Sequence, residues 1–113
     1  MQNYIKGLLG SMAVSAKYRG YPITVVACEL LLEDEMLLYA VNKELYPKVA
    51  QRCKCSGTTI ERNIRTVIMH IWDRNRQKLF EIAGYEMDAP PTVTEFLGIL
   101  ISHLQRSETV MKK

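Results

Sequence analysis

A run of aliphatic residues at helical spacing, between residues 60 and 71, constrains this chain more than any other feature. Aliphatic side chains recur there at i, i+4, i+7, i+8 and i+11, so a helix places on one face Ile60, Ile64, Val67, Ile68 and Ile71. At about 100° per residue, the opposite face carries Thr58, Arg62, Arg65 and Met69. An entirely aliphatic inner face and a basic outer face are typical of a helix that is anchored in a core and enters a DNA groove.

The segment before this helix predicts a shorter helix and a turn. Pro47 fits the first turn of a helix, where its missing N–H costs nothing, and KCSG at residues 54–57 breaks the pattern, with Lys54 where a glycine is expected. Two starts compete for the next helix: Thr58 and Glu61 have capping-box spacing, and Ser56 is an N-cap two residues earlier. A short helix, a turn and a longer basic helix outline a helix-turn-helix motif.

The positive charge of the chain is concentrated on the same segment. The net charge is +3 over 113 residues, but residues 43–78 hold nine Lys/Arg and three Asp/Glu, a net charge of +6. Residues 1–42 carry −1 and residues 79–113 carry −2. A solvated basic face is the alternative interpretation, but the coincidence of charge and helix pair favours contact with the phosphates of nucleic acid.

The remaining segments predict further helices, so we expect an all-α fold of about six helices around the helix-turn-helix. Apolar residues recur at helical spacing in residues 4–12, 23–41 and 96–104, and a short helix at about residues 77–83 is expected to stop at Gly84. No apolar run reaches about 18 residues, so no segment is expected to span a membrane. Residues 1–113 are expected to form one domain with an ordered core at about 4–105 and a frayed end at 107–113.

Residue types that carry catalysis or bind metals are sparse. The three cysteines are an odd number, and Cys53 and Cys55 have one residue between them rather than the two to four of zinc sites. His70 and His103 lie on separate predicted helices without a nucleophile nearby. We therefore expect no enzyme, no cofactor and no metal, and thiols that stay reduced in a cytoplasm. The aromatic residues Trp72 and Tyr85 are expected in the core.

Several short runs occur in an order that is shared with a known family. They are Arg19-Gly20-Tyr21, Leu45-Tyr46-Pro47-x-x-Ala50, Ile60-Glu61-Arg62-x-Ile64-Arg65, Trp72, Gly84-Tyr85 and Pro91-Thr92-x-x-Glu95-Phe96. Through these runs the chain resembles the C-terminal DNA-binding (effector) domain of the stage-zero sporulation response regulator, the bacterial master regulator of endospore formation. The resemblance covers about residues 4–105.

The resemblance implies a transcriptional regulator with a recognition helix at about Thr58–Asp73 in the major groove of double-stranded DNA. It implies binding to short boxes with a TGTCGAA-like core, often as head-to-tail pairs, and base contacts from Glu61, Arg62 and Arg65. This assignment is chemically sensible, because arginine can bind O6 and N7 of guanine together and glutamate can accept from N4 of cytosine. Around these residues, the side chains that could hold phosphates are Lys54, Ser56, Thr58, Thr59, Thr66 and Arg74.

The chain also departs from the family pattern. Thr58-Thr59 replaces a Ser-Arg pair, which removes one cation, and Asn63 and Thr66 replace the Ala and His that flank Ile-Arg. The segment after Trp72, which in the family helps to contact the polymerase sigma factor, is one residue shorter. No receiver domain precedes Met1, so we expect either a fragment or a stand-alone effector domain.

Two functions therefore remain open at the level of sequence. The first is a sequence-specific DNA reader whose further partners are the sigma factor and a second copy of the chain on tandem boxes. The second is a protein-interaction module, derived from the same domain, that no longer reads DNA and modulates another regulator. The broad apolar last helix, Phe96–Leu104, would be the feature of that second function.

Overall fold

The computed structural model describes residues 2–111, with side chains for residues 2–106. Over this range it contains no strands, and its elements are α1 (Gln2–Ser11), α2 (Gly20–Glu33), the 3-10 segment η1 (Glu35–Ala40), the π segment η2 (Val41–Leu45), α3 (Tyr46–Cys53), α4 (Gly57–Ala83) and α5 (Val93–Met111). The predicted all-α fold is confirmed, with five α-helices and two short helical segments in the described range. The sequence predicted a frayed end at 107–113, but the backbone of α5 stays helical to Met111, and residues 112–113 lie outside the described residues.

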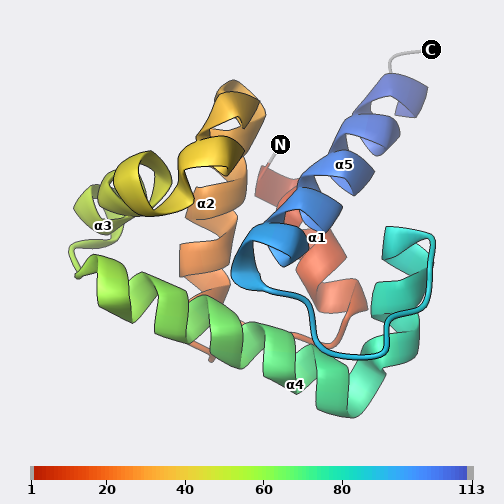
Figure 1. Cartoon of the computed structure of the whole chain (residues 1–113). Helices are drawn as coiled ribbons and strands as arrows, with labels where there is room; N and C mark the ends of the chain where they lie inside the picture. The colour runs from red at the N-terminus through yellow and green to blue at the C-terminus, as the bar shows by residue number, and fades with distance from the viewer. Residues whose placement is uncertain (1, 112–113) are drawn as a thin grey trace.

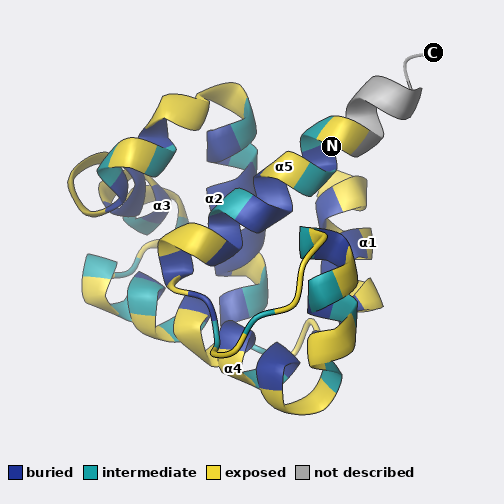
Figure 2. Ribbon diagram, turned by 45° about the vertical axis from the view of Figure 1, so that its right-hand side comes forward, coloured by how far each residue is buried: buried dark blue, intermediate teal, exposed yellow. Residues whose placement is uncertain are grey.

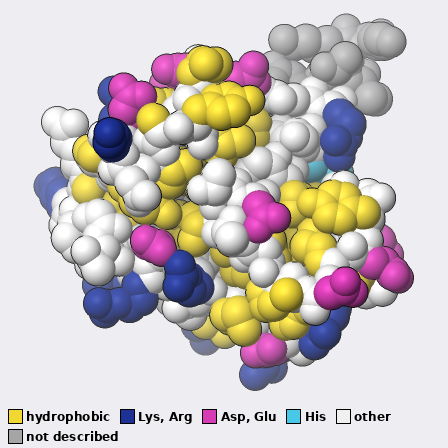
Figure 3. Space-filling model, viewed as in Figure 1, with side chains coloured by type: hydrophobic (Ala, Val, Ile, Leu, Met, Phe, Trp, Pro, Cys, Tyr) yellow, Lys and Arg dark blue, Asp and Glu magenta, His cyan; other side chains and the backbone are white. Residues whose placement is uncertain are grey.

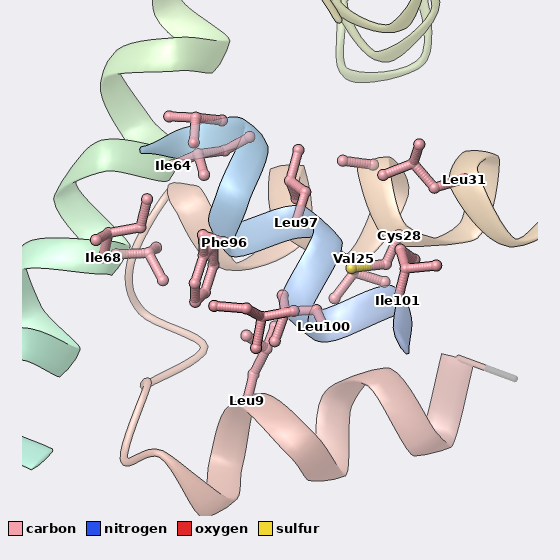
Figure 4. Close-up of a cluster of buried hydrophobic side chains, with 14 of the residues drawn as sticks. Leu9, Val25, Cys28, Leu31, Ile64, Ile68, Phe96, Leu97, Leu100 and Ile101 are labelled. Atoms are coloured by element: carbon pink, nitrogen blue, oxygen red, sulfur yellow. The ribbon is translucent and has the colours of Figure 1, made fainter. Parts of the chain in front are cut away.

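Helix α4 forms one edge of the molecule, and α2 and α5 both pack against it (Figure 1). Helix α1 packs on α2, and α3 lies between α2 and the start of α4. The core is a single cluster where these helices meet, with side chains from four of them converging (Figure 4), among them Leu9 of α1, Cys28 of α2, Ile64 of α4 and Phe96 of α5. As a consequence, each helix has one buried side and one exposed side (Figure 2).

The helix ends follow local chemistry. Ser56 caps α4, since its hydroxyl accepts from the N–H of Thr59 at 3.2 Å, so the earlier of the two predicted starts is the real one. The capping box predicted for Thr58 and Glu61 is wrong. A capping box forms instead at α5, where the Thr92 hydroxyl accepts from the N–H of Glu95 and the Glu95 carboxylate accepts from the N–H of Thr92.

Helix α4 contains both the predicted basic helix and the predicted short helix at 77–83. The two meet at Asn75, whose backbone is not helical (φ −154°, ψ 41°), so a kink divides α4 there. The helix ends at Gly84, which has the left-handed conformation (φ 88°) expected of a C-terminal glycine.

The apolar surface of the last helix is buried as far as its side chains are described, up to residue 106. In that range its large apolar residues belong to the core, namely Phe96, Leu97, Ile99, Leu100, Ile101 and Leu104. Trp72 is buried as predicted, whereas the prediction for Tyr85 is wrong: it lies just after Gly84 and is 55% exposed. Among the described helices, none is long and apolar enough to cross a membrane.

Candidate nucleic-acid interface

The helix-turn-helix consists of α3, the turn at residues 54–56 and the first half of α4. Pro47 lies in the first turn of α3, as predicted, and α3 ends at Lys54 in the left-handed conformation (φ 54°, ψ 49°). The N–H groups of Lys54 and Cys55 both donate to the carbonyl oxygen of Ala50. These hydrogen bonds close α3 sharply, so that only three residues, 54–56, separate it from α4.

The first half of α4 has the two faces that the sequence predicts. Its inner face is completely buried, with relative exposures of 0–1% for Ile60, Ile64, Val67, Ile68 and Ile71. Its outer face is exposed and carries Thr58, Arg62, Arg65, Thr66 and Met69. Because the inner face is fixed in the core, the side chains of the outer face project from a rigid support.

Two of the three predicted base-contacting residues form an ion pair on this helix. The guanidinium of Arg65 donates to the carboxylate of Glu61 one turn earlier, at 2.5 Å, while both side chains stay largely exposed (64% and 42%). An exposed i,i+4 pair contributes only about 0.3–0.5 kcal/mol, so a ligand can take either partner away at little cost. Arg62, the third residue, is exposed on the same surface.

Tyr46 lines the same small cleft as this ion pair and was not identified from the sequence. Burial, and secondarily the negative charge of Glu61, raises the pKa of Tyr46 to about 12, with Arg65 acting in the opposite direction. These three residues share a small cleft of about 140 Å³ with Asn42 and the start of α5. Tyr46 is fifteen residues away from Glu61 in the chain, so no spacing rule could have linked them.

The predicted phosphate-contacting residues near the turn fall into two groups. Lys54 and Thr58 are exposed, and their side chains point outward at the start of the helix. Ser56 and Thr59 are instead engaged in capping, because their hydroxyl oxygens lie 2.9 Å apart and Ser56 also accepts from the N–H of Thr59. Their hydroxyls lie at the N-terminus of α4, where the free backbone N–H groups favour the binding of an anion.

The other two predicted phosphate-contacting residues lie further along α4. Thr66 is exposed, but its hydroxyl donates to the carbonyl oxygen of Arg62 at 3.0 Å. Arg74 is exposed beside the bend at Asn75. Its neighbour Arg76 is held in place, since its Nε donates to the carbonyl oxygen of Trp72 at 3.0 Å and its guanidinium stacks 4.6 Å from the centre of the Trp72 ring.

Two contacts behind α4 fix its position. Gly20 at the start of α2 leaves no room for a side chain, because a Cβ atom there would lie 2.4 Å from the carbonyl oxygen of Asn63. His70 ties α4 to the loop after α1: its Nε2 donates to the carbonyl oxygen of Ala13 (3.1 Å), and its Nδ1 accepts from the hydroxyl of Tyr18 (2.9 Å). The half-buried His70 therefore has a structural partner on each ring nitrogen.

Some of the candidate cations lie close together in the part of the chain that the structure describes. Figure 3 shows Lys and Arg side chains at the lower left, where Figure 1 places the start of α4, and others elsewhere on the same face. The turn and the outer face of α4 bring together the candidate residues from Lys54 to Thr66, whereas Arg74 lies at the far end of the first half of α4.

A comparison with protein families agrees with this geometry. Residues 5–104 match the family model described as "Sporulation initiation factor Spo0A C terminal". The matched range covers nearly the whole chain and includes every candidate contact residue from Lys54 to Arg74.

Proposed function

This chain belongs to the family of Spo0A C-terminal domains, which are DNA-binding regulatory domains rather than enzymes, and we propose that it reads specific DNA sequences. The observation that carries the proposal is the exposed basic face of α4, whose aliphatic back is fully buried. Residues 43–78, which contain this face, carry a net charge of +6, whereas the whole chain carries a net charge of only +3. We propose that the chain acts in this way in the bacterial cytoplasm.

In the proposed complex the first half of α4, about Thr58–Asp73, lies in the major groove. Arg62 and Arg65 bind guanine through O6 and N7, and Glu61 accepts from cytosine N4. The weak Glu61–Arg65 ion pair supports this proposal, because it holds an acceptor and a donor side by side on the exposed face and opens at little cost. The target is a box with a TGTCGAA-like core, as the family resemblance implies.

The proposed phosphate contacts come from Lys54, Ser56, Thr58, Thr59, Thr66 and Arg74. The capping arrangement at the start of α4 supports this assignment for the first four. Their side chains surround the positive end of the helix dipole, where a phosphate oxygen is favoured.

Substitution of Arg62 by alanine tests the proposed base contacts. We expect Arg62→Ala to cost about 1–3 kcal/mol of specific binding and to relax the requirement at one base position. The matched control is Lys6→Ala on the exposed face of α1, which removes the same charge away from the proposed surface and should leave box preference unchanged. Fluorescence anisotropy, on duplexes in which each base of the box is replaced in turn, measures the affinity and the base preference of both variants. Equal binding of Arg62→Ala and wild type to every duplex would contradict the role of Arg62.

Further partners are proposed from the resemblance. We propose that the bend around Asn75, with exposed Arg74 and Gln77, contacts the sigma factor of RNA polymerase, and that two copies bind tandem boxes head to tail. A gel-shift titration on one box and on two boxes tests the second point. Binding of a second copy should be tighter when the boxes have the natural spacing than when half a helical turn is inserted.

A protein-interaction module that no longer reads DNA is the second candidate function. The segment Phe96–Leu104 of the last helix does not support it, because its apolar side chains are buried. A different observation does: a groove of about 530 Å³ between η1, α5 and the loop after α4 is rimmed by the exposed apolar residues Met36, Tyr39 and Tyr85. Hydrophobic side chains with acidic ones beside them are visible on this face in Figure 3. A stable dimer that is indifferent to DNA would favour this function, and a monomer that binds boxes would favour the first.

A further inference from the structure

Tyr46 takes no part in the proposed base contacts, although it shares a cleft with two of the residues that make them. It is the first residue of α3, and its side chain is only 6% exposed. It also lies close to the start of α4, where a Cβ atom added at Gly57 would be 3.8 Å from Cβ of Tyr46. A buried tyrosine usually gives its hydroxyl a hydrogen-bond partner. Among the described residues the Tyr46 hydroxyl has none, and it is not sealed from solvent as Oγ1 of Thr24 is, so its proton is available for donation.

Tyr46 and Glu61 together line two hollows at the start of α4. The larger hollow, of about 300 Å³, is lined by Asn42, Tyr46, Pro47, Gly57, Thr58 and Glu61. The smaller one, of about 140 Å³, shares Asn42, Tyr46 and Glu61 with it and extends to Arg65 and the start of α5. Because both hollows have both residues in their walls, Tyr46 and Glu61 border the same space.

The charges on this surface act on Tyr46 as well. Burial, and after it the negative charge of Glu61, raises the pKa of Tyr46 to about 12, whereas the positive charge of Arg65 lowers it. The phenol thus stays protonated at neutral pH, while an ionised carboxylate is an acceptor only. A hydrogen bond from Tyr46 to Glu61 would have an ionised acceptor, which makes it stronger than a hydrogen bond between two neutral groups.

In the free chain the Glu61 carboxylate has a different partner. It accepts from the guanidinium of Arg65, and this exposed ion pair is weak. In the proposed complex Arg65 binds guanine instead, so Glu61 loses the donor that orients it. A glutamate on an exposed helix face has several rotatable bonds, and ordering it against a base costs conformational entropy. A donor on a rigid neighbouring helix reduces that cost, and Tyr46 at the start of α3 is placed to be this donor.

We propose that Tyr46 is a positioning residue, whose hydroxyl donates to one oxygen of the Glu61 carboxylate when Arg65 leaves it for DNA. The other carboxylate oxygen is then aimed at N4 of cytosine. The carboxylate thus passes from Arg65 in the free chain to Tyr46 in the complex. This inference rests on the proposed base contacts, and it adds the residue that sets how strongly cytosine is preferred at the base pair that Glu61 reads.

Tyr46→Phe removes the hydroxyl and keeps the buried ring, so it tests the proposal without emptying the core. Anisotropy titrations on boxes with each base pair replaced in turn give the preference at every position, and Glu61→Ala marks the position that Glu61 reads. At that position Tyr46→Phe should weaken the preference for cytosine roughly three- to tenfold, the factor that one hydrogen bond of ordinary strength supplies. The preferences at all other positions should stay as in the wild type. The matched control is Tyr4→Phe, which changes an exposed tyrosine of α1 that lines neither hollow and should alter no preference.

A double-mutant cycle separates positioning from a merely structural role of Tyr46. In the Glu61→Ala background Tyr46→Phe should cause no further change in base preference, because no carboxylate remains to be held. Equal losses with and without Glu61, a uniform loss of affinity on every duplex, or an unchanged preference for cytosine would overturn the proposal. Two other results would show instead that the proposed function fails: a wild type that does not prefer boxes, or a Glu61→Ala variant with every base preference intact. Either result removes the contact that Tyr46 is proposed to position, and the inference falls with it.

Discussion

The close approach of α2 and α4 at Gly20 leads to a prediction whose sign can be worked out from the structure. Gly20 is buried at the start of α2, and an added Cβ atom would lie 2.4 Å from the carbonyl oxygen of Asn63 and 2.6 Å from Cγ2 of Val67. Ordinary contacts between heavy atoms begin near 3.5 Å. The carbonyl oxygen belongs to the backbone and cannot rotate away, so Gly20→Ala must separate the two helices by about 1 Å.

We expect Gly20→Ala to lower the free energy of unfolding by about 1–3 kcal/mol, the usual cost of overpacking a core. The matched control is Gly7→Ala, the same substitution on the exposed face of α1, where an added Cβ meets nothing within 4 Å. There alanine should raise the free energy of unfolding by about 0.5–1 kcal/mol, because glycine is a poor helix former.

Urea unfolding followed by circular dichroism measures both variants. The pair should differ in sign, with the midpoint of Gly20→Ala below that of the wild type and the midpoint of Gly7→Ala above it. A Gly20→Ala variant as stable as the wild type would refute the close packing of α2 on the recognition helix. Equal destabilisation by both variants would refute the reasoning about local space.

Four further predictions concern the ends of helices and the loop behind α4. Lys54→Gly should raise the free energy of unfolding by about 0.5–1 kcal/mol, because a left-handed backbone strains lysine. The same substitution should lower the affinity for DNA, because it removes a cation. A lower midpoint of urea unfolding than in the wild type would contradict this account of the turn. Thr92→Ala should cost about 1 kcal/mol in urea unfolding through loss of the cap of α5. Hydrogen bonds from the backbone and side chain of Thr92 hold the pKa of Glu95 below its ordinary value of 4.5. The ionised carboxylate therefore stabilises the fold at pH values above 4.5, and this stabilisation is lost as the pH falls through the lower pKa of the folded state. Glu95→Gln should therefore flatten the acid end of a plot of Tm against pH, and an unchanged plot would contradict the capping box. Tyr18→Phe removes the hydrogen bond to His70 and should cost about 1 kcal/mol, with faster hydrogen exchange in residues 12–19; unchanged exchange would contradict the role of His70 as a tether.

The parts of the fold that the sequence predicted are those fixed by local periodicity. The burial of residues 60–71 on one side of α4 follows from spacing alone, because a helix of this length has only one face that is aliphatic throughout. The same reasoning located α5 and its buried surface.

The differences arise where several local signals compete or where distant residues decide. Ser56 and Thr58 are both good N-caps, and the sharp closure of α3 at Lys54 settles the choice in favour of Ser56. The bend at Asn75 is not such a difference, because it divides α4 into the basic helix and the short helix predicted at 77–83, and Arg76 supports it by donating to the carbonyl oxygen of Trp72 and stacking on its ring. Tyr85 is exposed because the chain leaves the core at Gly84, which aromatic character alone does not reveal.

The candidate site shows the same division. The outward direction of Arg62 and Arg65 could be predicted, since it is the complement of the aliphatic face. The position of Tyr46 in one cleft with the Glu61–Arg65 ion pair could not be predicted. It depends on how α3 packs against the start of α4.

The central claim is that this chain reads DNA sequence, and anisotropy titrations on two duplexes test it most directly. One duplex carries two TGTCGAA-like boxes and the other a scrambled sequence of the same composition, each at two salt concentrations. The account predicts tighter binding to the boxes and a steep loss of affinity with salt, because every phosphate neutralised contributes about 0.9 to the slope. Equal and weak binding to both duplexes would contradict it, leaving a basic surface without sequence preference and the apolar groove beside η1 as the place to look for function.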